Sequence, residues 1–309
     1  MKYVLFFKNF LDTPKNYYNN IILNVLGFQV LRYLFHNFIH FIFNQSKSIN
    51  IDNDKKYFEL ENEGITVIED CFSDDDFKII ANVFDSEIKQ DQKIYNKDNT
   101  GLNWCVLTFD SNTFNNKLKN VYDIVFKNQK IQNIISKSLN IKDIGKPLIS
   151  FQMLENPDDN DDDKDIQLAL HSDRFFPCFK LYLSVEINDI ENGAYRYSKR
   201  SHRFSFKRLF HEYEFSIRNA LFNSGFKIKQ DFEYSRCVPK KKYFKNLYAN
   251  TESIITKKNT VVISNNKGFH SRGKMEKGTI RKQIRIVYYY LQRPIYYNFF
   301  KKIYNFAFK

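Results

Sequence analysis

The chain has 309 residues and a formal net charge of +13, and 43% of its residues are hydrophobic and 17% aromatic. This length fits two average domains or one all-β barrel of about 200–250 residues with additional segments, and the hydrophobic share is enough to bury a core. So basic a balance favours an anionic partner, whether nucleic acid, anionic lipid or a phosphorylated substrate. The abundance of Lys, Asn, Ile, Phe and Tyr is also typical of an AT-rich genome, which weakens the argument from charge.

The four cysteines exclude two classes of site. Cys71, Cys105, Cys178 and Cys237 are scattered along the chain with no C-x-x-C spacing. They therefore predict neither a disulfide framework nor a zinc site. Each is expected to be a small core or surface residue with a reduced thiol.

Residues 1–54 form the first of three predicted segments, a hydrophobic to amphipathic helical region. Within it, residues 21–43 are apolar over about the length of a membrane span. Arg32, His36 and His40 interrupt this run at intervals of four residues, which places one polar stripe on an apolar helix. An arginine at mid-bilayer costs about 2.5–3.5 kcal/mol, so a true span is the least favoured alternative. A helix packed on the following domain and a helix lying on a membrane surface both stay open.

Residues 55–291 are predicted to form one mainly β domain with flanking helices. Ser73 and the three acids after it predict the start of a helix, because serine caps and early acids stabilise a helix N-terminus. Runs of β-branched and aromatic residues predict strands. The strands are expected at residues 64–68, 148–154, 181–187, 260–263 and 284–290, and further helices between 114 and 139 and over 208–222. Strands connected in this way, with helices outside them, indicate a double-stranded β-helix, or jelly roll.

Residues 292–309 are predicted to form a basic amphipathic helix. Pro294 suits the first turn of a helix, and apolar residues recur after it at helical spacing, with Lys301, Lys302 and Lys309 on the other side. Such a helix is typical of a membrane-surface element, although it would pack equally well on the N-terminal helix. Peripheral membrane contact through the two terminal helices is therefore one prediction from the sequence.

Two histidines and one carboxylate stand out as a candidate metal centre. His171-Ser172-Asp173 ends an apolar run, and His270 follows a predicted strand and a glycine-containing turn. In an extended segment residues i and i+2 share a face, so His171 and Asp173 can point together while Ser172 points away. Two imidazoles and a carboxylate are the ligand set of the facial triad, which holds Fe(II) and leaves coordination positions open.

An H-x-D triplet alone is a weak signal, because it arises by chance in roughly half of chains with this composition. Arg281, eleven residues after His270, strengthens it. Arg281, Gln283 and Arg285 share a face of the next predicted strand. The rigid fork of a guanidinium grips carboxylates at two points, which suits a carboxylate-bearing co-substrate.

Several short motifs resemble the phytanoyl-CoA dioxygenase family of the Fe(II)/2-oxoglutarate-dependent oxygenases. The resemblance covers residues 60–291 and leaves out both flanking segments. It is carried by residues 171–177 (HSDRFFP), 191–194 (ENGA), 201–203 (SHR) and 268–273 (GFHSRG), by Arg281 at the expected distance, and by the opening strand at 64–70. Together these motifs are fairly specific, although none is specific alone.

The resemblance implies a jelly roll in which His171, Asp173 and His270 bind Fe(II). It further implies that 2-oxoglutarate chelates the iron and that Arg281 holds its distal carboxylate, with Arg285 as the reserve candidate. With O2, 2-oxoglutarate would be decarboxylated to succinate and a C–H bond of the substrate hydroxylated. Related halogenases lack the carboxylate ligand, so Asp173 argues against that branch.

Four further residues are tentative substrate contacts. Phe175, Phe176 and Phe269 would line an apolar pocket near the metal, although core packing explains them equally well. Arg272 would contact substrate or pair with an acid. The histidines outside the triad, which are His36, His40, His202 and His211, are not expected to be ligands.

Two departures from the family pattern concern turns. Lys199-Arg200 stands where Pro-Gly is usual, so the turn can differ and place two cations toward the substrate. Asn259 stands in a hairpin where glycine is common, and asparagine tolerates the left-handed conformation that such a turn needs.

The sequence therefore predicts an iron- and 2-oxoglutarate-dependent hydroxylase acting on a small molecule or on a lipid-linked substrate such as a glycolipid. Reduced thiols and an oxidisable Fe(II) centre favour the cytoplasm. The alternative is a non-catalytic jelly roll that binds an anionic ligand or a membrane surface. A nucleic-acid partner is not favoured, because the basic residues are dispersed and no recognised motif is present.

Overall fold

The computed structural model describes residues 18–45, 55–90, 96–97, 102–113, 115–139, 144–157, 167–226, 237–238 and 245–288. The predicted C-terminal helix at 292–309 lies outside the described residues, as do parts of the predicted N-terminal segment.

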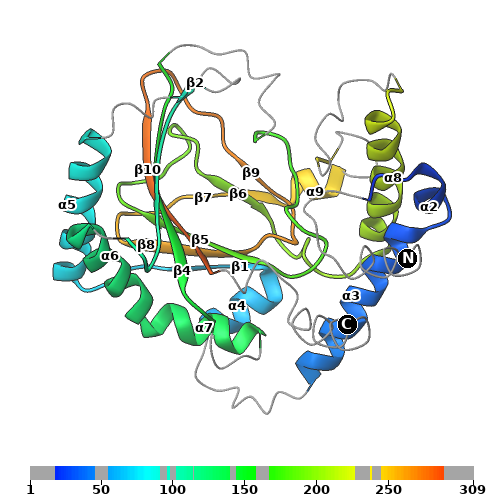
Figure 1. Cartoon of the computed structure of the whole chain (residues 1–309), viewed down its shortest axis with the longest axis horizontal. Coiled ribbons are helices and arrows are strands. Elements are labelled where there is room, and N and C mark those ends of the chain that lie inside the picture. Colours follow the sequence, from blue (N-terminus) through cyan, green and yellow to red (C-terminus); the bar gives the residue numbers. More distant parts are fainter. Residues whose placement is uncertain are drawn as a thin grey trace.

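Two antiparallel sheets form the centre of the protein, and the predicted jelly roll with flanking helices is confirmed (Figure 1). The larger sheet has the order β1 (Ile65–Ile68), β8 (Thr260–Asn265), β5 (Phe179–Ser184), β10 (Ile280–Tyr288), β4 (Pro147–Glu155), β3 (Asn103–Phe109) and β2 (Asn96–Lys97). The smaller sheet has the order β7 (Thr251–Ile254), β6 (Tyr195–Ser198) and β9 (His270–Arg272), and a short helix, α9 (Lys245–Ala249), precedes β7 in the chain.

The period of two along each strand of the larger sheet separates an apolar face from a polar one. On β10, Ile284 and Ile286 are fully buried in the main core. Arg281, Gln283 and Arg285 alternate with them and lie on the opposite face, as predicted. The polar face therefore lies away from the main core, where side chains from both sheets can meet.

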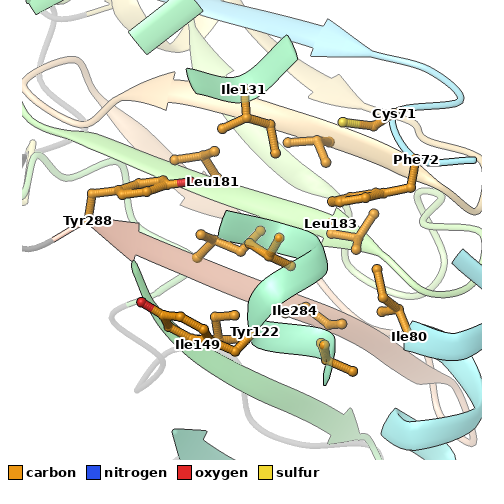
Figure 2. Packing of buried hydrophobic residues seen from close by; sticks show 14 of the residues in the cluster. Cys71, Phe72, Ile80, Tyr122, Ile131, Ile149, Leu181, Leu183, Ile284 and Tyr288 are labelled. Atoms are coloured by element: carbon orange, nitrogen blue, oxygen red, sulfur yellow. The ribbon is translucent and has the colours of Figure 1, made fainter. Parts of the chain in front are cut away.

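Four helices cover the apolar face of the larger sheet. They are α4 (Lys55–Glu63), α5 (Asp74–Gln90), α6 (Asn116–Lys127) and α7 (Gln129–Leu139). Figure 2 shows the core that they bury, with Leu181 and Leu183 of β5 in one cluster with Ile80 of α5 and Ile131 of α7. The predicted serine cap of α5 is confirmed, because Oγ of Ser73 accepts from the backbone N–H of Asp76 at 3.2 Å.

The predicted strand over 181–187 is displaced in the structure. β5 starts at Phe179 and ends at Ser184. Beyond it, Asn188 forms an isolated bridge with Thr256, which follows β7 of the smaller sheet. The chain has therefore left the larger sheet, and Ile187, which the apolar pattern assigned to a strand, is 59% exposed.

The apolar N-terminal run forms two helices, α2 (Ile21–Val25) and α3 (Phe28–Gln45), separated at Gly27, whose φ is +88°. Both pack on α8 (Phe206–Asn223). The polar stripe of α3 faces inward, since Arg32 and His36 are fully buried. The helix is therefore packed on the domain, and no described helix is long and apolar enough to cross a membrane.

Both unusual turns adopt the left-handed conformation. Asn259 has φ 59°, as predicted, and Arg200 has φ 64° at the position where glycine is usual. The two cations of the Lys199-Arg200 turn do not point toward a substrate site. Lys199 pairs with Glu252 at 2.6 Å and Arg200 with Glu63 at 2.9 Å.

Candidate metal centre

The fold brings His171, Asp173 and His270 together, as the sequence predicted. The backbones of His171 and His270 exchange two hydrogen bonds of 2.9 and 2.8 Å, which join the two ligand-bearing segments. One ligand atom from each of the three side chains lies within 4.8 Å of the others. Ligand atoms bound about 2.1 Å from one ion lie about 3 Å apart at right angles, so a small side-chain rotation completes the site.

Both imidazoles are oriented by backbone carbonyls. Nδ1 of His171 lies 2.9 Å from the carbonyl of Ala169, and Nδ1 of His270 lies 3.1 Å from that of Gly268. An Nδ1–H that donates to a carbonyl leaves the Nε2 lone pair for a metal, and this second contact is typical of metal-binding histidines. The donor set and its tautomers therefore fit an iron ion.

The protonation states also suit a metal. Burial, and then the charge of His270, lower the pKa of His171 to about 3, so the imidazole is neutral at physiological pH. Burial alone would raise the pKa of Asp173, but Lys180 and His270 outweigh it and hold that pKa well below its usual value. Neutral imidazoles and an ionised carboxylate are the forms that bind divalent metals.

Two residues at the triad were not identified from the sequence. Nζ of Lys180 lies 2.6 Å from Oδ2 of Asp173. The amide of Asn266 donates to the same oxygen at 2.8 Å and lies 3.0 Å from Nε2 of His270. When a metal binds, Nε2 of His270 has to give up its contact with the Asn266 amide and bind the ion instead. The signal for Lys180 was available, because it alternates with the core residues Phe179 and Leu181 and so must face the site.

Arg281 fits a carboxylate ligand. Its guanidinium donates to the carbonyl of Gly193, yet Nε has no partner and the side chain forms no ion pair with the described residues. It is buried, and burial, then the charge of Arg272, lower its pKa to about 9. A buried cation without a counter-ion is costly unless a ligand supplies the charge. Nε of Arg285 also has no partner, and its guanidinium lies 3.4 Å from Oγ of Ser150, but Arg285 is less buried, so burial makes Arg281 the first candidate.

Arg208 of α8, also missed from the sequence, connects the two ligand-bearing loops. It donates to Oγ of Ser172 at 2.9 Å and to the carbonyl of Lys267 at 2.7 Å. Glu212 accepts from its Nε at 3.0 Å, and both side chains are buried. Its guanidinium also lies 4.5 Å from the ring centroid of Phe269. Because Ser172 stands between two ligands and Phe269 precedes the third, Arg208 can set the spacing of the triad.

The three predicted substrate phenylalanines lie in packed clusters. Phe175 and Phe176 are buried with Tyr33 of α3. Phe269 is buried with Leu170 in a separate cluster. The structure therefore favours core packing over a substrate role for all three. Arg272, by contrast, lies half-buried at the end of β9, and its charge contributes to the lowered pKa of Arg281.

Gly268 is required by close packing. A Cβ atom at this position would overlap the hydroxyl of Tyr197 and lie 3.0 Å from Oγ of Ser201. That hydroxyl of Ser201 accepts the backbone N–H of Phe269 at 2.8 Å. The glycine of the distal-histidine turn thus lets the turn lie against the smaller sheet and places His270.

Lys267, next to this turn, predicts a pH dependence of stability. Burial, and then Arg208, lower its pKa from 10.5 to about 7. Below pH 7 both the folded and unfolded states hold the proton, and folding buries a charge. Between about pH 7 and 10.5 only the unfolded state holds it, so the free energy of unfolding rises with pH, by at most about 1.4 kcal/mol per unit.

We expect Lys267→Met to remove this part of the slope. The measurement is denaturant unfolding of the metal-free wild type and variant between pH 6 and 10. Other groups that titrate in this range affect both proteins and cancel in the difference. Parallel slopes in the two proteins would show that folding does not lower the pKa of Lys267.

No protein-family model matches this chain, and no curated protein sequence is significantly similar to it. Solved structures with a related arrangement include AviO1 from Streptomyces viridochromogenes Tue57, with 10% identity, a TM-score of 0.45 and coverage of 77% of this chain and 95% of that one. HygX from Streptomyces hygroscopicus, solved with nickel and 2-oxoglutarate, has 11% identity, a TM-score of 0.44 and coverage of 75% and 84%. EctD from S. alaskensis, solved with iron, has 11% identity, a TM-score of 0.48 and coverage of 78% and 79%. Likenesses this remote do not assign an activity, which has to be argued from the side chains.

Proposed function

We propose that this protein is an Fe(II)- and 2-oxoglutarate-dependent dioxygenase that hydroxylates a C–H bond. The observation that carries the proposal is the triad of His171, Asp173 and His270, with both imidazoles already oriented for binding through Nε2. Two histidines and a carboxylate with open positions are diagnostic of non-haem Fe(II) oxygenases.

Different side chains would have different roles in such a reaction. His171, Asp173 and His270 would hold the iron, and Arg281 would bind the distal carboxylate of 2-oxoglutarate. Bound iron, with O2 and the decarboxylation of 2-oxoglutarate to succinate, supplies the oxidising power. Lys180 balances the charge of the carboxylate ligand, and Asp173 and His270 are themselves buried.

The finer assignment is to the phytanoyl-CoA dioxygenase family, with a lipid or glycolipid as the substrate class. The motifs of residues 171–177 and 268–273 support the family. Asp173 supports hydroxylation over halogenation, because it fills the position that a halide would need. The basic, aromatic terminal segments support a substrate presented at a membrane surface.

Arg281→Ala tests the proposal. We expect the KM for 2-oxoglutarate to rise at least about 30-fold, because removing one partner of a buried charge pair costs about 2–5 kcal/mol. The assay is succinate formation by the iron-loaded protein with no added substrate. The unfolding midpoint of the free protein is expected to stay the same or rise, since a buried unpaired charge is removed.

Arg285→Ala is the matched control, because it removes the same group from the same face of β10 and is expected to leave the KM unchanged. If Arg285→Ala raises the KM and Arg281→Ala does not, the reserve candidate holds the carboxylate. If wild type forms no succinate with iron, O2 and 2-oxoglutarate, the proposed activity is wrong.

One observation favours the alternative, a non-catalytic jelly roll. The ion pair between Lys180 and Asp173 already satisfies the carboxylate ligand and competes with a metal for it. A protein that binds an anionic ligand without iron would keep this pair. The purified wild type would then take up no Fe(II), and Lys180→Met would create iron binding instead of leaving it unchanged.

A further inference from the structure

Helix α3 is oriented with its polar side toward the protein and its apolar side outward. Gln29, Arg32 and His36 are completely buried. On the outward side, Leu31 is 57% exposed and Phe38 is 61% exposed. A helix on the surface of a globular protein normally shows the opposite arrangement.

Hydrogen bonds to α8 and its surroundings fix this orientation. Nε2 of Gln29 donates to Glu212 at 2.9 Å, and Nη1 of Arg32 donates to Oε1 of Gln29 at 3.1 Å. Lys267 donates to the side chain of Asn37 one turn further along α3. Turning the helix to hide its apolar side would break these bonds and leave Glu212 buried without Gln29. The exposure of the apolar side therefore follows from the internal contacts.

The exposed apolar surface continues onto the neighbouring helices. Asn24 of α2 donates to the carbonyl of Ser216 on α8 at 3.0 Å, which holds the helices together (Figure 1). Large apolar side chains at the start of α8 are also exposed. We call this surface the α3 face; it comprises Ile22, Val25, Leu26, Leu31, Leu34, Phe38, Phe41, Ile42, Phe204, Phe206 and Phe210. Large contiguous apolar patches on soluble proteins mark interaction sites.

We propose that the α3 face docks on an anionic lipid bilayer and inserts its apolar side chains among the acyl chains. Residues 18–45 contain one charged residue, Arg32, and that side chain is buried. The outward side of α2 and α3 therefore brings no charge into the lipid. Arg203 and Lys207 are exposed beside the phenylalanines at the start of α8, where they can meet anionic headgroups.

The charge of the chain supports the same partner. The segments 1–17 and 289–309, which flank the described residues, contain three and four Lys or Arg, seven in all, against one acid. Near an anionic membrane each such cation contributes about 1 kcal/mol of attraction. The apolar residues lie along the outside of a helix, which suits the plane of a bilayer, whereas a peptide helix would need a groove.

The α3 face is connected to the metal centre through few contacts. Gln29 of α3 bonds to Glu212, which bonds to Arg208, which bonds to Ser172 between two of the ligands. Resting on the proposed function, this connection makes lipid, or a molecule anchored in lipid, the substrate class, because docking would bring the loops that carry the iron next to the membrane.

Vesicle flotation of the full chain tests the docking face. The probes are vesicles of phosphatidylcholine alone and vesicles in which a third of the lipid is phosphatidylserine. The test variant is Leu31→Gln/Phe38→Gln/Phe41→Gln, which keeps good helix formers at exposed positions. The control variant, Ile187→Gln/Ile190→Gln/Ile255→Gln, removes three exposed apolar side chains outside the α3 face.

We expect wild type and control to float with anionic vesicles and the test variant to partition at least about tenfold more weakly, the change that 1.4 kcal/mol represents. Wild type that stays with the soluble fraction overturns the proposal. The proposal is also overturned if wild type and control are dimers and the test variant is a monomer, since a second copy would then cover the α3 face. A fall in the unfolding midpoint confined to the test variant, without flotation of wild type, would assign the face to another segment of this chain.

Failure of the docking proposal is distinguishable from failure of the proposed activity. Succinate formation without vesicles is expected to be equal in wild type and the test variant, because none of the three replaced side chains contacts the metal centre. A protein that floats but forms no succinate would keep the docking face and lose the oxygenase assignment.

Discussion

Replacing His270 by alanine is expected to lower the affinity for Fe(II) by more than about 100-fold, since even the loss of a residue behind a ligand costs 10- to 100-fold. His270 supplies one of three ligand atoms, and its imidazole is already oriented by the carbonyl of Gly268. The loss of one ligand leaves a two-coordinate site that water must complete. The measurement is an anaerobic titration of the metal-free protein with Fe(II), with calorimetry as the readout.

His202→Gln is the matched control for this prediction. His202 is a buried histidine outside the triad, and its Nε2 lies 3.1 Å from the carbonyl of Glu61. We expect the iron affinity of this variant to equal that of wild type. If His270→Ala binds iron as tightly as wild type, or if both variants lose the same iron affinity, the triad is not the metal site.

Replacing Arg208 by methionine is expected to have two separable effects. Glu212 loses the guanidinium that donates to it and forms its buried ion pair, which should lower the free energy of unfolding by about 3–5 kcal/mol. The hydrogen bonds to Ser172 and to the carbonyl of Lys267 are also lost, so the ligand loops are no longer joined. Loss of such support should weaken iron binding by about 10- to 100-fold.

The double variant Arg208→Met/Glu212→Gln separates these effects. It removes both charges of the pair and keeps a carbonyl oxygen that can accept from Gln29, so stability is expected to return while iron binding stays weak. Arg208→Lys keeps a cation near Glu212 but lacks the planar fork that reaches both loops, and is expected to recover stability more fully than iron affinity. Full recovery of iron binding in the double variant would show that Arg208 acts only on stability.

The sequence was informative wherever a pattern is local. The pairing of His171 with Asp173 was predictable because an extended segment places residues i and i+2 on one face. The same alternation places Ser172 on the opposite face. The left-handed turn at Asn259 was predictable for a similar reason, since few residues adopt that conformation without strain. Strand β10 was identified through its β-branched and aromatic residues, and the predicted shared face of Arg281, Gln283 and Arg285 extended it to within one residue of its start at Ile280.

Contacts between distant segments were not predictable in the same way. Arg208 lies in a helix whose own pattern does not indicate that its guanidinium reaches Ser172, 36 residues earlier. Asn266 contacts Asp173 across 93 residues of sequence. These contacts depend on how α8 and the turn after β8 pack against the ligand loop, and a single sequence contains no signal for that packing.

The orientation of α3 was also not predictable from the sequence. A polar stripe on an apolar helix can face water or face the protein, and Arg32 and His36 fit both. The outcome depends on Glu212, which lies about 180 residues away and provides the buried acceptor for the stripe through Gln29. Without that acceptor, burial of Arg32 would be prohibitively costly.

Anaerobic addition of Fe(II) and then 2-oxoglutarate to the metal-free wild type tests the central claim most directly. Chelation of 2-oxoglutarate by iron in the triad should produce a weak visible charge-transfer band. We expect this band in wild type and its loss in His171→Ala and in Arg281→Ala at the same concentrations. A wild type that binds iron and 2-oxoglutarate without the band would contradict the account and favour a jelly roll that binds anions without this chemistry.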